Sequence, residues 1–273
     1  MNTTPRELSL AHLSVLDCTP PELVTVAAQA GFRKIGIRLY ATPSVGVPPY
    51  DMLGDTPLLR ETLARLAATG LSVLDVEFLR FEPEIPQGIP EGFLETGARL
   101  GAQYVLVMST EPLAARTLER FCDLCDRARQ YGLHVAVEFA IYTGVRTLAD
   151  AARLVKESGC TNASVLVDAL HFSRSGGLPS DIAGIDASLF RYAQICDAAA
   201  VIPTERGDLI REARTGRLLP GEGVLPLRDL VAALPPAIPL AIEAPVRATT
   251  GLPALERAQR AWRSMQALLG HKG

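Results

Sequence analysis

Short apolar runs alternate with amphipathic runs along the whole chain. The apolar runs are nearly continuous, which is typical of parallel strands that are buried on both faces. Eight of them are predicted as strands: Leu8–Leu13, Lys34–Leu39, Ser72–Phe78, Tyr104–Met108, His134–Phe139, Ser164–Asp168, Tyr192–Cys196 and Leu240–Glu243. Their alternation with helical runs indicates repeated strand–helix units.

Six amphipathic runs are predicted as helices: Pro20–Ala30, Thr56–Thr69, Pro90–Leu100, Thr117–Tyr131, Thr147–Ser158 and Pro253–Leu269. A glycine directly follows each of the first five runs, as a left-handed helix C-cap requires. Several of these glycines lead straight into the next predicted strand, as in TGLSVLDVEF and YGLHVAVEF. This order is the second half of a βαβ unit, repeated along the chain.

Eight such units close naturally into a barrel. The competing architecture is an open doubly wound sheet, which normally carries a Gly-rich phosphate turn, and the chain has no GxGxxG. The sequence therefore predicts an α/β fold, a single (β/α)8 TIM barrel, in one domain over residues 1–273. Two longer segments, Tyr40–Asp55 and Ala198–Gly223, are predicted to be loops that form a lid or rim over a site.

Composition and charge exclude some partners. The 273 residues suit one barrel, which needs about 250. The formal net charge is −3 and no run of Lys or Arg stands out, so we expect neither a nucleic-acid nor a membrane-surface partner. Met1–Leu10 lacks the pattern of a signal peptide, and no stretch of 18 apolar residues occurs.

The five cysteines are odd in number and irregular in spacing, which fits a reducing cytoplasm, where we expect the protein to reside. Cys122 and Cys125 form a CxxC inside a helical pattern. No second Cys or His pair in the sequence completes a zinc site with them. We therefore interpret both as helix residues near a core.

Polar residues mark the ends of the predicted strands, where a barrel of this kind carries its chemistry. In chain order they are His12, Arg38, Glu77, Ser109, Glu138, Asp168 with His171, Gln194 with Asp197, and Glu243. A carboxylate that closes a buried strand is costly unless it is paired or binds a cation. The strand ends therefore predict a charged site at the barrel mouth.

Four of these groups lie on strands five to eight, which are consecutive neighbours in a closed barrel: Glu138, Asp168, Gln194 and Glu243. Three carboxylates and one amide form an oxygen-rich set, which hard cations prefer. The sequence predicts one divalent metal ion here, Mn²⁺ or Mg²⁺, with Co²⁺ as a third option. The alternative is that some of these carboxylates form salt bridges with Arg38 or Arg214.

The remaining polar residues have two interpretations each. His171 either orients a ligand or contacts substrate, and Glu77 is either an acid/base group or an ion-pair partner. His12 is structural or lines the substrate pocket. Arg214 and Arg217, in EARTGRLLPGEG, either bind a phosphate or carboxylate or form a solvated rim. We predict that His12, Arg38, Glu77 and Arg214 bind substrate.

Five segments are similar to the xylose isomerase-like TIM barrels, which are described broadly as sugar phosphate isomerases and epimerases. These segments are VEF (137–139), LVDALHF (166–172), YAQICDA (192–198), PGEGVLPL (220–227) and LAIEAPV (240–246). The resemblance runs over essentially the whole chain. It implies that the metal ligands are Glu138, Asp168, Gln194 and Glu243.

The position of Gln194 departs from the pattern of ketose 3-epimerases, which usually carry His there. Some 3-dehydroshikimate dehydratases of the superfamily use Gln as a ligand instead. However, EFA at 138–140 lacks the Glu-x-His of one branch of those dehydratases. A third branch, the DNA-repair endonucleases, builds a multi-zinc cluster from many histidines, and four His in the chain exclude it.

From this resemblance we expect a divalent-metal-dependent isomerase or epimerase that acts on a sugar or related hydroxy-ketone through an enediolate intermediate. Glu138 and Glu243 are the candidate bases, and His171 assists. If a β-hydroxyl leaves, the same step gives dehydration, as in lyases of the 3-dehydroshikimate dehydratase or inosose dehydratase type. Hydroxypyruvate isomerisation needs the same paired glutamates.

A non-catalytic barrel that binds a sugar or a metal is the alternative from another class, because a fold does not guarantee activity. The expected partner is a small molecule: a sugar, a keto-sugar or a cyclic polyol ketone. Exposed barrel helices often pair, so a homo-oligomer remains an open option.

Overall fold

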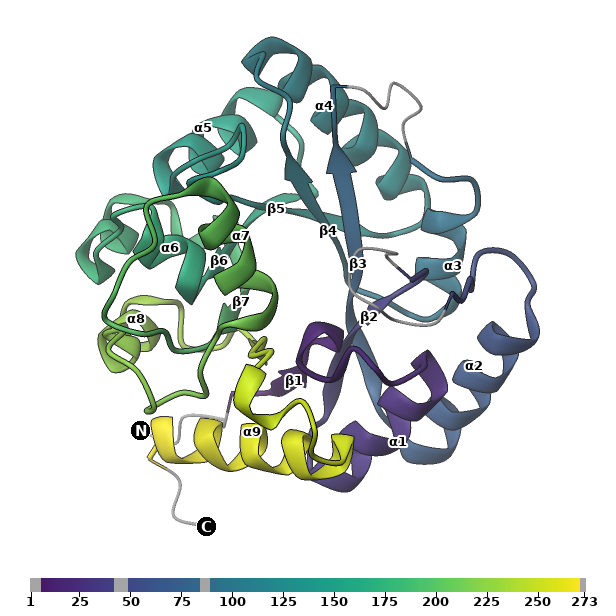
Figure 1. Ribbon diagram of the computed structural model, residues 1–273. Helices are drawn as coiled ribbons and strands as arrows, with labels where there is room; N and C mark the ends of the chain where they lie inside the picture. Colours follow the sequence, from purple (N-terminus) through teal and green to yellow (C-terminus); the bar gives the residue numbers. More distant parts are fainter. Residues whose placement is uncertain (1–5, 42–48, 84–88, 271–273) are drawn as a thin grey trace.

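Eight parallel strands pair in chain order and close into a barrel, with β8 beside β1 (Figure 1). The computed structural model describes residues 6–41, 49–83 and 89–270. The strands are β1 Leu8–Leu10, β2 Lys34–Arg38, β3 Ser72–Phe81, β4 Tyr104–Ser109, β5 His134–Glu138, β6 Ala163–Asp168, β7 Phe190–Ile195 and β8 Leu240–Ile242. The predicted (β/α)8 fold is confirmed, and each predicted strand overlaps one of these.

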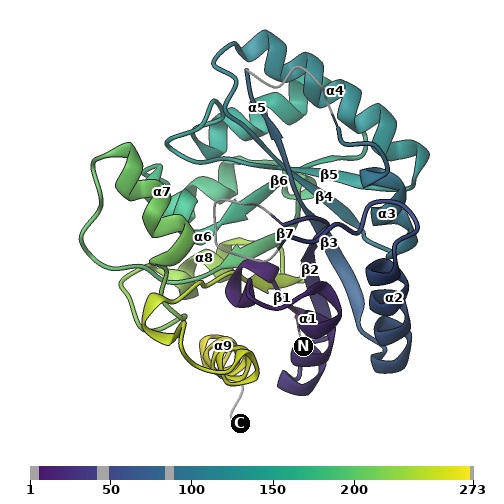
Figure 2. The same ribbon diagram turned by 45° about the vertical axis from the view of Figure 1, so that its right-hand side comes forward.

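Helices surround the barrel on its outer side (Figures 1 and 2). The α-helices are α1 Pro20–Ala30, α2 Pro57–Thr69, α3 Phe93–Arg99, α4 Ala114–Gln130, α5 Leu148–Ser158, α6 Ala169–Arg174, α7 Arg206–Thr215, α8 Leu227–Ala233 and α9 Ala254–Leu268. Four short 3-10 helices complete the described elements: η1 His12–Val15, η3 Pro179–Gly184, η4 Ala187–Leu189 and η5 Arg247–Thr249. Helix α1 packs against both α2 and α9.

Helix ends follow the local chemistry of the sequence. Helix α1 begins with a capping box, in which Thr19 and Glu22 bond each other's backbone N–H groups. It ends at Gly31, whose φ of 102° is the predicted left-handed cap. A Cβ at Gly31 would lie 2.6 Å from the indole nitrogen of Trp262, so this glycine also lets α9 approach α1.

The predicted rim loop Ala198–Gly223 was wrong as a loop throughout, because it contains α7. The sequence hides this helix, since α7 is polar overall and opens with a glycine, Gly207, in its first turn. The other predicted loop, Tyr40–Asp55, lies partly outside the described residues. In its described part Tyr40 forms an isolated antiparallel bridge with Asp51. Within the described residues no helix is long and apolar enough to cross a bilayer.

Two apolar clusters fill the molecule. The larger one lies between the strands and the surrounding helices. The smaller one fills the barrel interior and consists of Leu74, Leu106, Met108, Ala136, Ala140, Leu166, Tyr192 and Ala241. Side chains two residues apart on a strand share a face. On β5, β6, β7 and β8, residues that follow an inner-cluster residue by two positions therefore also face the interior, nearer the carboxyl ends of the strands.

Candidate metal centre

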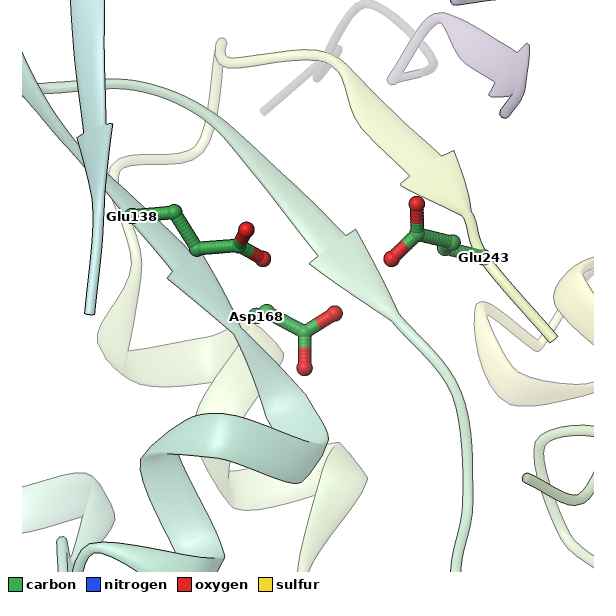
Figure 3. Close-up of side chains that lie close together, drawn as sticks. All are labelled: Glu138, Asp168 and Glu243. Atoms are coloured by element: carbon green, nitrogen blue, oxygen red, sulfur yellow. The ribbon is translucent and has the colours of Figure 1, made fainter. Parts of the chain in front are cut away.

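Three carboxylates meet at the carboxyl ends of β5, β6 and β8. Glu138, Asp168 and Glu243 each follow an inner-cluster residue by two positions, which points all three into the barrel mouth. One ligand oxygen from each lies within 4.8 Å of the others (Figure 3). All three residues are at least 95% buried. The predicted convergence of these strand-end carboxylates is therefore present in the structure.

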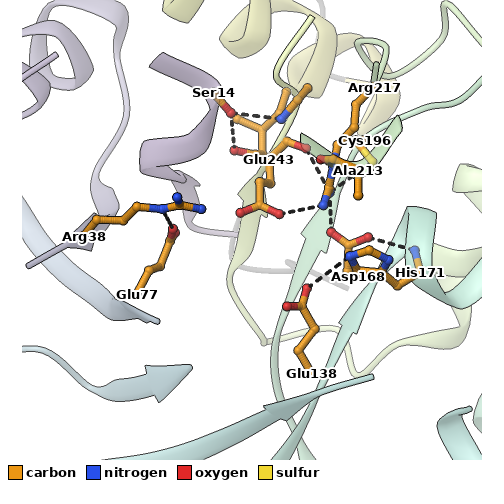
Figure 4. Close-up of polar contacts among 12 residues, drawn as sticks. Ser14, Arg38, Glu77, Glu138, Asp168, His171, Cys196, Ala213, Arg217 and Glu243 are labelled. Carbon is orange, nitrogen blue, oxygen red and sulfur yellow. Dashed lines mark hydrogen bonds and ion pairs between the residues drawn. The ribbon is translucent and has the colours of Figure 1, made fainter. Parts of the chain in front are cut away.

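Arg217 is the buried cation of this cluster. Its guanidinium lies 2.5 Å from Oδ2 of Asp168 and 2.9 Å from Oε2 of Glu243 (Figure 4). It also donates to the backbone oxygens of Ala213 and Glu243. With 2% exposure, Arg217 belongs to the site itself and is not a solvated rim residue.

The cluster is electrostatically crowded. Burial and the neighbouring carboxylates Glu243 and Asp168 raise the pKa of Glu138 well above its usual range. Burial raises the pKa of Glu243 to about 8, against the opposing effect of Arg217. Asp168 behaves differently: burial acts to raise its pKa, but Arg217 and hydrogen bonds hold it below the ordinary value. Repulsion among the three carboxylates favours the binding of a cation or of protons.

Gln194 on β7 faces the same interior, because it follows Tyr192 of the inner cluster by two residues. It pairs in register with Asp168 on β6. Both its amide oxygen and its amide nitrogen are buried and have no hydrogen-bond partner among the described residues. A buried polar group without a partner costs about 1–3 kcal/mol, and a cation on the amide oxygen would remove part of that cost.

These residues fit a divalent cation. If Glu138, Asp168 and Glu243 are all ionised, their three negative charges face the single positive charge of Arg217. The excess of two negative charges equals the charge of one divalent ion. Each ionised carboxylate offers about four lone-pair sites, so the bonds to Arg217 leave room for a metal.

His171 lies beside the cluster, in α6. Its Nε2 is 3.9 Å from Oε1 of Glu138, too long for a hydrogen bond, and its backbone N–H donates to Oδ1 of Asp168 at 3.0 Å. Burial lowers the pKa of His171 to about 4, so the ring is neutral near pH 7. Tyr142 meets this ring edge-on at 5.6 Å between centroids.

The opposite side of the mouth holds paired charges. Arg38 on β2 donates to Oε2 of Glu77 on β3 at 3.2 Å (Figure 4). Asp75, two residues before Glu77, accepts a hydrogen bond from the Tyr192 hydroxyl at 3.3 Å. Burial, with Glu77 and Glu243 nearby, raises the pKa of Asp75 well above its usual range. Gly36 makes room for both acids, because a Cβ there would lie within 2.8 Å of each.

His12 does not line the pocket, which corrects its predicted place among the substrate-binding residues. Strand β1 ends at Leu10, and His12 opens the 3-10 helix η1 instead. Its Nε2 lies 2.9 Å from the Cys18 carbonyl oxygen, and its Nδ1 accepts from the Arg38 backbone N–H. With both ring nitrogens bonded and no exposed surface, His12 has a structural role.

Two other strand-end residues are structural as well. The Ser109 hydroxyl bonds the Thr117 hydroxyl and accepts from the Glu111 backbone N–H. The Asp197 carboxylate accepts three backbone N–H bonds, from Ala198, Gly221 and Leu225. Asp197 therefore shapes the loop that contains the PGEG segment.

A pocket opens over the carboxylates and encloses about 730 Å³ of empty space, including its mouth. Its polar lining includes Glu138, His171, Glu243, Arg38, Glu77 and Arg214. This volume lies within the range of small-molecule sites. Of the residues predicted to touch metal or substrate, Asp168, Gln194 and His12 do not line this pocket; the first two lie in the barrel interior beside it.

Sequence reasoning missed two groups of this site. For Arg217 the sequence left open whether it binds an anion or forms a solvated rim, and it did not indicate that Arg217 bonds two of the three carboxylates. Asp75 was passed over inside an apolar run. Its spacing of two from Glu77 was the available signal, because it puts both acids on one face of the strand.

The family model described as xylose isomerase-like TIM barrel matches residues 24–266. A curated relative, inosose isomerase of Halalkalibacterium halodurans, is 26% identical over 154 residues. That match covers 53% of this chain and 52% of the relative, so the chain spans about half of the relative's length.

Two solved structures share the fold. The first is a xylose isomerase-like TIM barrel/4-hydroxyphenylpyruvate dioxygenase fusion protein, with a TM-score of 0.80 and 20% identity over 97% of this chain and 43% of its own. The second is the IOLI protein with a bound zinc atom, with a TM-score of 0.78 and 21% identity over 97% of this chain and 98% of its own. At these identities the likeness concerns the fold.

Proposed function

The chain belongs to the xylose isomerase-like TIM barrel family, and on that premise we propose that it is a divalent-metal-dependent isomerase or epimerase. Its substrate is a sugar or a related hydroxy-ketone, and the reaction passes through an enediolate. The observation that carries the proposal is the convergence of the buried acids Glu138, Asp168 and Glu243 at one point beside a single cation, Arg217. The curated relative is named an isomerase, which agrees with this reaction class.

Glu138, Asp168, Gln194 and Glu243 would hold the metal. The donors are all oxygen atoms, which favours Mn²⁺ or Mg²⁺, with Co²⁺ as a third option. Bound there, the ion would supply Lewis acidity for a reaction at a carbonyl. Arg217 keeps Asp168 and Glu243 in place and offsets part of their charge.

Glu138 and Glu243 are the proposed bases. Both line the pocket, where a substrate C–H can approach their carboxylates. If the two exchange protons on opposite faces of one carbon, the product is an epimer. If one of them carries the proton between neighbouring carbons, the product is an isomer.

His171 is proposed to position a substrate oxygen. Its ring is neutral and lines the pocket beside Glu138, so an imidazole N–H is available as a hydrogen-bond donor. Arg38 and Glu77 line the other side of the same pocket and would contact the substrate's remaining hydroxyls.

A lyase is the second candidate. The observation that favours it is Gln194 where ketose 3-epimerases of the family usually carry His. A neutral His171 beside Glu138 could also donate a proton to a leaving β-hydroxyl. Because both reactions share the enolate step, in which a proton leaves the carbon beside the carbonyl, the same base serves either outcome.

We further propose that the chain forms one domain and binds a small molecule. Its five cysteines are free, as in a reducing compartment, and we propose that it works in the cytoplasm.

Solvent deuterium uptake tests the proposal. The Mn²⁺-loaded protein is incubated with a panel of hydroxy-ketones in D₂O, and exchange is followed by NMR. We expect exchange in wild type and a loss of about 10²–10⁴-fold in Glu138→Gln. Glu256→Gln, an exposed substitution on α9, is the matched control and should exchange like wild type.

The two reaction classes separate in the same assay. A lyase also forms a conjugated product that absorbs ultraviolet light, whereas an isomerase or epimerase does not. Absence of both exchange and product across the panel would contradict catalysis, and the non-catalytic binding barrel would then be the better account.

A further inference from the structure

The pocket over the carboxylates is unusually rich in arginine. Five arginines line it: Arg38, Arg80, Arg206, Arg214 and Arg217. Three of them have acidic partners within the protein, since Arg38 pairs with Glu77, Arg80 with Glu82, and Arg217 with Asp168 and Glu243. Within residues 6–41, 49–83 and 89–270, Arg206 and Arg214 form no hydrogen bond or ion pair.

Arg214 lies in the last turn of α7 and lines the same pocket as Arg38 on β2 and Arg80 on β3. Burial lowers the pKa of Arg214, and the positive charges of Arg80 and Arg38 lower it further. Those two guanidiniums lie against one ring, at 4.9 Å and 5.1 Å from the centroid of Phe78. Three guanidiniums thus gather on one side of the pocket.

Glu77 and Glu82 neutralise two of these charges, so the charge of Arg214 is the one that needs an anion. On the exposed surface of the same helix, the charge of Arg211 is neutralised by an ion pair with Asp208, one turn away. Arg214 has no such partner in the described chain, although it is only part-exposed and lines the pocket. A ligand is therefore the remaining source of its counter-charge.

Tyr142 connects this region to the carboxylates. Its ring contacts His171, and its hydroxyl is close enough to Glu138 and Arg214 for both charges to act on it. The arginine side and the carboxylate side are therefore two ends of one pocket, not two separate sites.

We propose that the substrate carries an anionic oxyacid group, a carboxylate or a phosphate, which binds between Arg80 and Arg214 while its hydroxy-ketone end lies at the three carboxylates. The placement of the reacting end rests on the proposed function. The anion site itself rests on the arginines alone. It selects an acidic substrate over a neutral sugar or a cyclic polyol ketone, since planar guanidiniums match the geometry of both anions.

Anion binding to the full-length, chelator-treated protein tests this proposal without metal or turnover. Inorganic phosphate and glycolate are titrated separately by calorimetry, at constant ionic strength. We expect saturable binding in wild type and binding weaker by about 10-fold or more in Arg214→Gln. Arg211→Gln removes the same charge from the exposed side of the same helix and should stay within about twofold of wild type.

The stronger of the two probes identifies the anion on the substrate. Arg80→Gln is the second variant and should weaken the same probe. Absence of saturable binding for both probes in wild type would overturn the proposal, as would equal weakening in Arg214→Gln and Arg211→Gln. Loss of the proposed function would instead appear as absent metal binding or absent deuterium exchange, neither of which enters this titration.

Discussion

The two halves of the barrel mouth handle charge differently. On the side of β2 and β3, Arg38 pairs with Glu77, and Arg80 pairs with Glu82. On the side of β5 to β8, three buried carboxylates share the single cation Arg217. The arginines on β2 and β3 each have an acidic partner, whereas on the other side, the unbalanced half, three carboxyl groups share one arginine.

The difference distinguishes charged residues that are paired within the protein from charged residues that a ligand would neutralise. A buried ion needs a partner, so an internal pair such as Arg38 with Glu77 can be purely structural. Among the described residues Glu138 forms no ion pair with an Arg or Lys, and the His171 ring, 3.9 Å away, is neutral. The unbalanced half is therefore where a metal ion contributes most.

The largest expected effect is on stability, in Arg217→Ala. Removing the buried partner of Asp168 and Glu243 should lower the free energy of unfolding of the metal-free protein by about 3–5 kcal/mol. Arg80→Ala breaks a pair whose side chains are 30% and 27% exposed, and should cost about 0–1 kcal/mol. Urea denaturation followed by circular dichroism measures both values.

Saturating Mn²⁺ should restore part of the stability of Arg217→Ala, because it replaces the missing positive charge. Equal losses in Arg217→Ala and Arg80→Ala would remove the distinction between the two halves.

The second effect is on pH dependence. Glu138 and Glu243 have raised pKa values in the folded state, so the folded protein binds more protons than the unfolded chain up to about pH 8. Stability contributed by a raised carboxyl pKa is lost as the pH rises. Burial lowers the pKa values of His12 and His171 to about 4, from an ordinary value near 6.5. Their contribution to stability therefore increases as the pH rises toward 6.5.

The informative window lies between about pH 6.5 and 8, because histidines of the unfolded chain are already more than half deprotonated there, while Glu138 and Glu243 still hold extra protons in the folded state. There the metal-free protein should lose on the order of 1–2 kcal/mol as the pH rises. Mn²⁺ affinity should increase over the same window, because the metal needs ionised carboxylates. A metal-free stability that is flat or rising between these pH values would contradict the crowded cluster.

A smaller effect is expected for Gln194→Ala. Its buried amide has no partner among the described residues, so the free energy of unfolding of the metal-free protein should change by less than about 1 kcal/mol. Mn²⁺ affinity should nevertheless fall by about 10-fold, if the amide oxygen is a ligand. A stability loss with unchanged Mn²⁺ affinity would assign Gln194 to the barrel core alone.

The sequence pattern predicted the fold and the three carboxylates because the signal for each lies within a short stretch of the sequence. Strand–helix alternation predicts the barrel, and an acid at the end of an apolar run predicts Glu138, Asp168 and Glu243. Arg217 could not be found this way, since its partners lie 49 and 26 residues away. His12 was misplaced because β1 ends two residues before it, and only the fold shows both of its ring nitrogens bonded.

The sequence pattern also failed to predict helix α7. Its stripe of apolar residues is narrow, and Ile210, Ala213 and Arg214 line the pocket together with side chains from strands far along the chain. Local propensity alone therefore does not predict this helix.

Calorimetric titration of Mn²⁺ tests the central claim most directly. The three proteins compared are chelator-stripped wild type, Glu243→Ala and Glu77→Ala. The first variant lacks a carboxylate on the side of β5 to β8, and the second lacks one on the side of β2 and β3. The account predicts one saturable site in wild type, weakened by about 10-fold or more in Glu243→Ala and by less than about threefold in Glu77→Ala. No saturable site in wild type, or equal weakening in both variants, would contradict a metal centre built on β5 to β8.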